Sequence, residues 1–359
     1  HIKEFKRLGV TGDFENYYST MSFEAEAQII RELGKFLLDG SLYQGFKPVF
    51  WSTVEKTALA DAEVEYQNHT SNTIFAAFKV KNASKEFLKD SNIIIWTTTP
   101  WTIPANRALA FNSAIEYSLV EINDLENFKE KKIVVATNLL DSIVRSCGIE
   151  KFKILKNFSG TEFAGTVCTH PFQTLGYNFD IPMLDARFVT LEQGTGIVHC
   201  APSHGPDDFN LCLKHNIPSK YTVDNSGYYT DEIPFFAKTH VFKADSIVID
   251  KLKELKKLLK NDKLQHSYPH SWRSKAPLIY RATPQWFISM EKNSLRKKAI
   301  KAIGDTTFYP PKGKERLMSM LEDRPDWCVS RQRSWGVPLP IFINKKTKEP
   351  LQDQKVIDR

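Results

Sequence analysis

Long hydrophobic runs are missing from this sequence. No apolar stretch in its 359 residues approaches the roughly 20 residues that cross a bilayer. The opening residues, HIKEFKRLG, contain no hydrophobic signal core. Internal repeats and low-complexity tracts are absent as well. We therefore expect a chain without a membrane partner that is not exported and works in the cytoplasm.

Cysteine is scarce and widely spaced. The five cysteines, at positions 147, 168, 200, 212 and 328, form no CxxC pair. An odd, scattered set of this kind argues against a disulfide scaffold and against a zinc finger built from these residues. The cysteine content therefore indicates a reducing compartment, such as the cytosol.

The composition is that of a globular protein. Hydrophobic residues make up 42% and charged residues 25% of the chain, which is too apolar for disorder and enough for one large core or two smaller ones. We expect at least two domains. The formal net charge of +7 is a mild indication of anionic partners, nucleic acid among them, because proteins without such partners also carry an excess of this size.

Periodicity divides the chain into regions of different character. Ser22 is positioned to cap an amphipathic helix that would stop at Gly40. Residues 66–229 contain short runs of Val, Ile, Phe and Thr broken by Gly, Asn and Pro, which predict a mostly β domain. Residues 244–263 return to helical period, with lysines that form either a solvated face or an RNA contact. A basic helix is predicted at 295–303.

A threonine cluster follows a strand-like run in IIIWTTTPWTIPANRALAF, residues 93–111. Side chains alternate in an extended segment, so Thr97 and Thr99 would share one face and Thr98 the other. Pro100 favours extended geometry at Thr99. Threonine is common in strands for packing reasons alone, but neighbouring hydroxyls can also hold a water and an ester oxygen together.

A second motif is GTGIVHCAPSHGPDDF, residues 194–209. His199 and Cys200 face opposite ways on a strand and cannot easily form a dyad, so Cys200 is expected to be a small buried hydrophobe. Ser203 lacks the GxSxG frame of a nucleophile elbow. Asp207 and Asp208 begin a predicted helix, where they are either caps or site carboxylates.

These two motifs together resemble the editing domain of isoleucyl-tRNA synthetases, a class I family. FKRLGVTGDFENYYSTM, GSLYQGFKPVFW, ALADAEVEY, YRATPQWF and DWCVSRQRSWGVPLP resemble the same family in order, so the likeness covers nearly the whole chain. Valyl and leucyl relatives usually carry an arginine within the threonine motif. The threonine that stands here at position 99, before Pro100, favours the isoleucyl family.

The resemblance implies an α+β fold, in which a mostly β, barrel-like editing domain is inserted between flanking α/β remnants of a class I nucleotide-binding fold. Residues 1–69 would form the end of the first half of the catalytic domain with a connecting segment, 70–266 the editing domain, and 267–359 the return segment. The HIGH and KMSKS motifs of class I aminoacylation are absent, so we expect a fragment that does not aminoacylate by itself. Gln332 and Trp335 match synthetic-site positions and would be a remnant of that site.

The resemblance also implies a function, the hydrolysis of mischarged valyl-tRNA(Ile). Thr97, Thr98, Thr99 and Asp208 would be catalytic, and Thr102, His199 and Trp101 would bind the substrate. His199 would exclude isoleucine, Asp208 would hold the α-ammonium group, and no protein general base is identified, although His204 and Asp207 are candidates. The expected partners are tRNA(Ile) with its aminoacyl-adenosine end and the valine moiety, with the protein a monomer. The alternatives are a non-catalytic tRNA-binding fragment and a stand-alone trans-editing deacylase.

The resemblance raises the question of zinc. Many relatives hold zinc with two CxxC pairs, and the matching positions here are Ser52, Glu55, Ser271 and Ser274, which offer no soft ligand. We predict no zinc and a junction that rests on packing by Trp51, Tyr268 and Trp272. No cofactor is expected in this fragment, since ATP and magnesium belong to the full-length enzyme.

Overall fold

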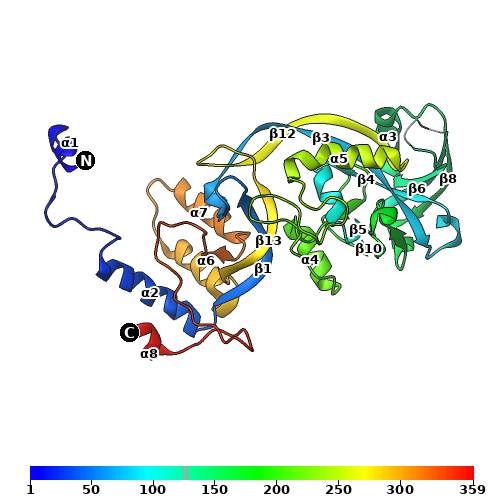
Figure 1. Cartoon of the computed structure of the whole chain (residues 1–359). Coiled ribbons are helices and arrows are strands. Elements are labelled where there is room, and N and C mark those ends of the chain that lie inside the picture. The colour runs from blue at the N-terminus through cyan, green and yellow to red at the C-terminus, as the bar shows by residue number, and fades with distance from the viewer. Residues whose placement is uncertain (124, 126–127) are drawn as a thin grey trace. The chain divides into compact units, whose positions relative to one another are not determined.

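The computed structural model describes residues 1–123, 125 and 128–359 (Figure 1). The chain divides into two compact units: residues 46–284, which we name the sheet unit, and residues 1–45 with 285–359, which we name the terminal unit. The chain passes from the terminal unit to the sheet unit within β1 (Leu42–Ser52) and returns within β13 (Ile279–Ile288). In the described part of the chain, every helix is too short or too polar to cross a membrane.

Ten strands of the sheet unit form one sheet. Their order is β11-β5-β10-β9-β3-β4-β7-β6-β8, and β12 pairs with β3 off this path. The strands are β3 (Val64–Asn82), β4 (Asn92–Thr97), β5 (Ala108–Phe111), β6 (Glu116–Ile122), β7 (Lys132–Ala136), β8 (Phe152–Ser159), β9 (Val167–Thr169), β10 (Asp180–Asp185), β11 (Val198–Cys200) and β12 (Leu258–Ser271). Because the path ends at two different strands, the described strands form an open sheet and not a closed barrel. The predicted α+β class is confirmed.

Helices and turns complete the sheet unit. Its α-helices are α3 (Leu140–Cys147), α4 (Pro206–Lys214) and α5 (Val241–Glu254). Its 3-10 turns are η1 (Asp61–Glu63), η2 (Glu86–Leu88), η3 (Pro100–Ala105), η4 (Thr137–Leu139), η5 (Gly160–Phe163) and η6 (Gln173–Leu175). The short β2 (Thr57–Leu59) pairs antiparallel with β1, with Phe50 opposite Leu59.

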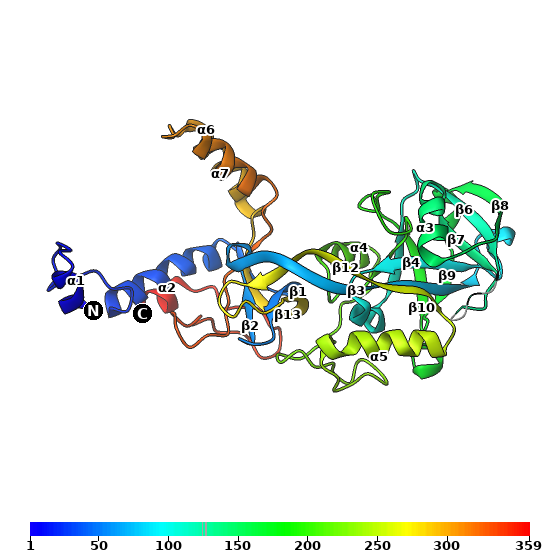
Figure 2. The same cartoon turned by 90° about the horizontal axis from the view of Figure 1, so that it is seen from above.

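The predicted domain limits differ from the observed unit. The sequence places them at 69/70 and 266/267, and both positions lie inside the long ribbon formed by β3 and β12, which is continuous in both views (Figures 1 and 2). The two strands pair antiparallel from Leu258 opposite Ala76 to Ser271 opposite Val64. The compact unit is therefore wider than the predicted editing domain, and the functions assigned to the three segments stay predictions.

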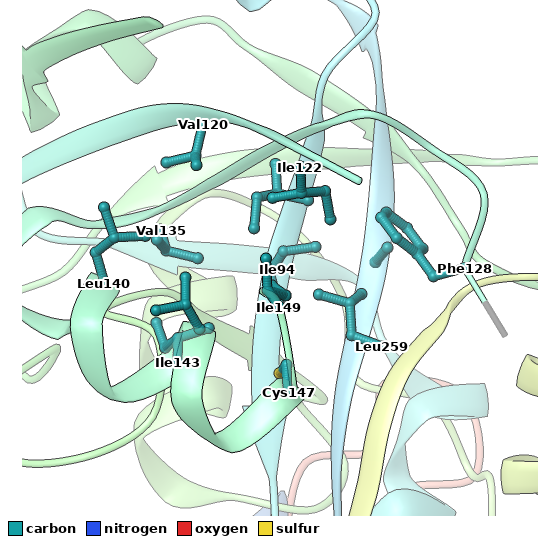
Figure 3. Packing of buried hydrophobic residues seen from close by; sticks show 13 residues of the cluster. Ile94, Val120, Ile122, Phe128, Val135, Leu140, Ile143, Cys147, Ile149 and Leu259 are labelled. Carbon is teal, nitrogen blue, oxygen red and sulfur yellow. The ribbon is translucent and has the colours of Figure 1, made fainter. Parts of the chain in front are cut away.

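Two hydrophobic clusters fix the strands that carry the site. One lies between the sheet and α3 and includes Ile94 of β4 (Figure 3). Its buried members are Ala77, Ile94, Val120, Ile122, Phe128, Ile133, Val135, Leu140, Ile143, Val144, Cys147, Ile149 and Leu259. A second cluster joins Ala108 of β5 and Cys200 of β11 to Leu211 and Cys212 of α4. Burial of each leucine, isoleucine or valine in these clusters contributes about 1.5–3 kcal/mol, which stabilises the positions of β4, β11 and α4.

The terminal unit contains mainly helices. They are α1 (Ile2–Arg7), α2 (Phe23–Leu38), α6 (Leu295–Asp305), α7 (Lys312–Glu322) and α8 (Gln354–Asp358), with the 3-10 turn η7 (Lys292–Ser294). In addition, β14 (Trp327–Cys328) pairs with the end of β13. The predicted helix after Ser22 is confirmed, since the Ser22 hydroxyl accepts the Ala25 N–H at 3.2 Å and the helix ends before Gly40. The predicted basic helix at 295–303 is confirmed as α6.

The helix predicted at 244–263 is only partly right. α5 occupies 241–254, but Leu258 and Leu259 begin β12. The helix stops because Lys256 adopts a left-handed backbone with φ of 55° and the Lys257 N–H turns back to the Leu252 carbonyl. Pairing with β3 then supplies backbone hydrogen bonds and burial for the two leucines, which overrides their helical spacing.

Candidate active site

One cavity of the sheet unit brings both sequence motifs together. Its volume is about 360 Å³, within the range of small-molecule sites. Three pairs of elements line it: β4 with η3, β11 with α4, and β12 with β13. The lining residues are Trp96, Thr97, Thr99, Trp101, Thr102, Val198, His199, Ala201, His204, Gly205, Asp208, Tyr268, Pro269, Leu278, Ile279 and Tyr280.

Three threonine hydroxyls form one wall of this cavity. β4 ends at Thr97, and Pro100 begins η3 two residues after Thr98. The Thr97 and Thr99 hydroxyl oxygens lie 3.2 Å apart, and those of Thr99 and Thr102 lie 3.5 Å apart. Thr98 is not among the lining residues, as the alternation of side chains along an extended segment requires. The structure thus groups Thr97, Thr99 and Thr102 and leaves out Thr98.

His199 is a buried, neutral imidazole. Its Nε2 lies 3.0 Å from the Thr102 hydroxyl, which itself donates to the Thr99 carbonyl at 2.9 Å. Nε2 of His199 is therefore the donor, and Nδ1 is an acceptor that has no partner among the described residues. Burial lowers the His199 pKa to about 4, with a smaller contribution from the nearby His204. The ring stays uncharged at neutral pH.

Asp208 supplies a carboxylate in the first turn of α4. Its Oδ2 accepts the Ala201 N–H at 2.8 Å. Burial raises the pKa of Asp208 to about 7, and Asp207 adds to the shift, while the Ala201 N–H opposes it. A carboxyl group in this state ionises readily when a cation approaches, because the charge of the cation offsets its desolvation. The arrangement suits the binding of an ammonium group.

The other polar groups of this region have structural roles. His204 lines the cavity, but Nδ1 lies 2.9 Å from the Tyr280 carbonyl oxygen and Nε2 lies 2.9 Å from the Thr222 hydroxyl. Asp207 is exposed and outside the lining. Ser203 donates to the Lys220 carbonyl at 2.7 Å. Cys200 is fully buried, which confirms its predicted role as a small hydrophobe. No candidate base or nucleophile emerges from these four residues.

Both backbone polar groups of Trp101 form hydrogen bonds with side chains. Its N–H donates to Asp245 Oδ1 at 2.9 Å, and its carbonyl accepts the hydroxyl of Tyr229. Its ring is buried and packs edge-on against His204, with centroids 4.8 Å apart. The structure therefore places Trp101 in the cavity wall, and its role in substrate binding stays a prediction.

Two residues or elements that contribute to the site were not predicted from the sequence. The first is Asp245, which lies on α5 beside the buried Ala244 and Val248. A carboxylate next to the apolar stripe of a helix is a signal that could have been noticed. The second is the β12–β13 wall, with Tyr268 and Tyr280. No local pattern reveals this wall, because the two strands reach the cavity through long-range pairing.

Gln332 and Trp335 lie in the terminal unit. The Gln332 side chain donates to Gln285 Oε1 at 3.1 Å. Trp335 is 69% exposed. Neither residue lines the cavity of the sheet unit, and their assignment as remnants of a synthetic site stays a prediction.

The four positions that match the zinc ligands of relatives do come together. Glu55 accepts hydrogen bonds from the hydroxyl of Ser52, from the Ser271 hydroxyl at 2.9 Å and from the Ser274 N–H at 3.0 Å. One carboxylate and three hydroxyl groups do not fit a structural zinc ion, which prefers thiolate or imidazole. Within the described ranges, no group of three or more His, Cys, Asp or Glu is arranged to hold a metal.

The junction at Glu55 therefore differs from the predicted one, which rested on aromatic packing. Trp51 is 1% exposed and stacks on the Arg281 guanidinium, as a packing role requires, but Trp272 is 41% exposed. The hydrogen bonds of Glu55 instead join the β1–β2 turn to the β12–β13 turn. These bonds lower the pKa of Glu55 against the opposing effect of burial.

Replacement of Glu55 by alanine is expected to destabilise the sheet unit. Ser52 and Ser271 are fully buried, and each would lose its acceptor, at a cost of about 1–3 kcal/mol in the free energy of unfolding. Denaturant unfolding followed by circular dichroism measures this loss, and Glu65→Ala, which removes an exposed carboxylate that pairs with Lys275, is the matched control. A metal chelator is expected to change neither midpoint. A lower midpoint with chelator would show that a metal ion stabilises this junction and would contradict the role given to Glu55.

Comparisons with known proteins identify the family of this chain. A family model described as "tRNA synthetases class I (I, L, M and V)" matches residues 1–359. The chain is 67% identical over 356 residues to an isoleucine–tRNA ligase of Pelagibacter ubique, and 47% identical over 375 residues to one of Gluconobacter oxydans. In both cases 99% of this chain and 39% of the relative are covered. The chain thus spans about two fifths of the length of these relatives.

Among solved structures, the chain has a weak likeness to the cytosolic leucyl-tRNA synthetase editing domain of P. knowlesi. It is 12% identical, with a TM-score of 0.41, over 55% of this chain and 96% of that one. The family assignment rests on the sequence, since the family model covers all 359 residues. The chain belongs to the class I tRNA synthetases, in the group described as I, L, M and V.

Proposed function

We propose that the cavity of the sheet unit hydrolyses the ester bond of valyl-tRNA(Ile), as the editing site of an isoleucine–tRNA ligase. The observation that carries this proposal is that Asp208, His199 and the hydroxyls of Thr97, Thr99 and Thr102 line a single cavity. The sequence relatives, named isoleucine–tRNA ligases, support the choice of tRNA. The ligase reaction with ATP and magnesium belongs, in this proposal, to the longer protein.

Such a site answers a physical limit on recognition. Isoleucine and valine differ by one methylene, which supports only about 1–3 kcal/mol of discrimination, a limit for which isoleucyl-tRNA synthetases are themselves the standard example. A second site that admits valine and excludes isoleucine removes the error. His199 is placed to act as the excluding wall, because it is buried and fixed by Thr102.

Asp208 would anchor the substrate. Every aminoacyl ester carries an α-ammonium group, and a charge-assisted hydrogen bond to a buried carboxylate is strong and directional. The N-terminus of α4 favours the ionised carboxylate as well. This contact would hold valine and isoleucine alike, so the selectivity between them would come from the wall formed by His199.

The threonine wall would position the reacting groups. A water oxygen forms a bond to the ester carbonyl carbon, the bond from that carbon to the ribose oxygen breaks, and a proton from the water ends on the ribose hydroxyl. The hydroxyls of Thr97 and Thr99 can orient the water and donate to the oxygen that gains negative charge. The Thr102 hydroxyl, whose hydrogen goes to the Thr99 carbonyl, can only accept. No covalent enzyme intermediate is needed, and in this proposal the ribose hydroxyl next to the ester relays the proton.

A deacylation assay with the chain tests the proposal. Valyl-tRNA(Ile) is expected to be hydrolysed faster than isoleucyl-tRNA(Ile) by about 100-fold or more. Equal rates for both would contradict the proposal. Salt-sensitive tRNA binding without hydrolysis of either ester would identify a binding module in its place. In this proposal the chain acts as a monomer, and sedimentation would measure its oligomeric state.

The pH dependence of this reaction follows from Asp208. Its pKa is raised to about 7, so in the free protein the carboxylate is lost as pH falls through that value. The value of kcat/KM is therefore expected to fall about tenfold per pH unit below pH 7. His199 and His204, with pKa values lowered to about 4, stay neutral across this range and add no inflection.

Measurement of kcat/KM from about pH 5.5 to 8, with spontaneous ester hydrolysis subtracted, gives this profile. Asp208→Asn is the control, since an amide does not titrate and its residual activity is expected to show no inflection near pH 7. A wild-type profile that is flat between these limits would remove the ionisation of Asp208 from the mechanism.

A further inference from the structure

The turn η3 carries part of the threonine wall, and one N–H at its start needs an acceptor from outside the turn. The first N–H groups of any helix have no partner within it. Pro100, the first residue of η3, has no N–H, and the Thr102 N–H donates to the Thr99 carbonyl at 2.9 Å. The Trp101 N–H is thus the first donor that needs an outside acceptor.

Thr99 is the N-cap residue of η3, yet its side chain does not cap. A threonine in this position normally accepts an N–H of the first turn with its hydroxyl. Here no such bond forms. The Thr99 hydroxyl lies 3.2 Å from the hydroxyl of Thr97 and lines the cavity. A side chain with a strong local preference is therefore engaged elsewhere.

Asp245, which lies on the helix α5, caps η3 in place of Thr99. Its Oδ1 accepts the Trp101 N–H at 2.9 Å, and its Oδ2 lies 3.5 Å from the Asn72 amide nitrogen. Burial raises the pKa of Asp245 to about 6. It has no ion-pair partner in the part of the chain that the structure describes. A partly buried carboxylate without an ion pair costs stability, so the contacts that Asp245 makes point to a role for it.

We propose that Asp245 is a positioning residue of the site: by capping η3 from α5, it leaves the Thr99 hydroxyl free to face the cavity. The effect of Asp245 on catalysis rests on the proposed function. The capping geometry is independent of that function. Without Asp245, the Thr99 hydroxyl turns toward the Trp101 N–H, as N-cap threonines do. The cavity then loses the middle hydroxyl of its wall.

Kinetics of valyl-tRNA(Ile) deacylation test the catalytic consequence. Asp245→Ala is expected to lower kcat about tenfold with little change in KM, because the loss is one of orientation. Asp245→Asn is expected to restore nearly the full rate, since the amide oxygen accepts the same N–H. Asp250→Ala, an exposed carboxylate on the same helix that pairs with Lys253, is the matched control and is expected to leave the rate unchanged.

A double-mutant cycle distinguishes this role from general destabilisation. If Asp245 acts through Thr99, then Thr99→Ala and Asp245→Ala each lower kcat, and the double variant is no slower than Thr99→Ala. Rates that multiply in the double variant would overturn the proposal. A rate for Asp245→Asn as low as that of Asp245→Ala would also overturn it, because the charge and not the acceptor would then matter.

A structural readout keeps the inference testable whatever the activity. Crystal structures of Asp245→Ala and Asp245→Asn are expected to show the Thr99 hydroxyl turned to the Trp101 N–H in the first and unchanged in the second. An unchanged Thr99 rotamer in Asp245→Ala would refute the capping role.

If the wild-type chain hydrolyses no ester, the proposed function fails, and this rotamer comparison still decides the role of Asp245. If the alanine variant does not fold, a displaced Thr99 in the asparagine variant would overturn the proposal and a retained one would support it.

Discussion

Replacement of Asp208 by asparagine is expected to lower kcat/KM for valyl-tRNA(Ile) by about a hundredfold, because the α-ammonium group loses a partly buried ionic partner. The amide keeps the size of the side chain and can still accept the Ala201 N–H that Asp208 accepts at 2.8 Å. The loss would therefore report the charge and not a collapse of the loop. Steady-state deacylation kinetics measure it, and an unchanged rate would remove Asp208 from the site.

The same variant is expected to be more stable than the wild type at pH 8. The pKa of Asp208 is raised from 3.8 to about 7 in the folded state. The protein therefore has the full contribution of the neutral carboxyl below pH 3.8 and loses it as pH rises through 7. At pH 8 the ionised carboxylate costs up to about 4 kcal/mol, since one pKa unit corresponds to about 1.4 kcal/mol.

Asparagine has no charge to bury, so its free energy of unfolding at pH 8 is expected to exceed that of the wild type. Near pH 4 the two proteins are expected to be similar. Denaturant unfolding at both pH values gives the comparison. A variant that is less active and also less stable at pH 8 would show that Asp208 is mainly a structural residue.

Replacement of His199 by alanine is expected to remove the selectivity of the site. The imidazole is 6% exposed and forms part of the cavity wall, so its loss opens room for the extra methylene of isoleucine. Isoleucyl-tRNA(Ile), which the wild type would spare, is expected to be hydrolysed at a rate within about tenfold of the valyl ester. The measured quantity is the ratio of the two values of kcat/KM.

His215→Ala is the matched control for this experiment. His215 follows α4, is exposed and does not line the cavity, so the ratio is expected to stay at the wild-type value. If His199→Ala instead lowers both rates equally and leaves the ratio unchanged, the wall that excludes isoleucine lies elsewhere, and the Tyr268 side of the cavity would be the next to examine.

Part of this structure could be predicted from local sequence. The helix after Ser22 and the helix at Leu295 follow from capping and spacing, and the position of Thr97 and Thr99 on one face follows from strand alternation. The helix predicted at 244–263 ends early at Glu254. Its leucines fit either a helix or a strand, and only the presence of β3 as a partner decides between them.

Local sequence determined the elements of this protein and the chemistry that they carry: a strand that ends in threonines, a helix that begins with two aspartates, and a family likeness that extends over the chain. The tertiary structure alone decided that these groups line one cavity, that Asp245 caps η3, and that Glu55 joins two turns more than 200 residues apart in sequence. The reason is physical. Secondary structure follows from backbone and side-chain preferences over a few residues. Burial and hydrogen bonding between distant segments depend instead on which strands and helices pack together in the folded chain.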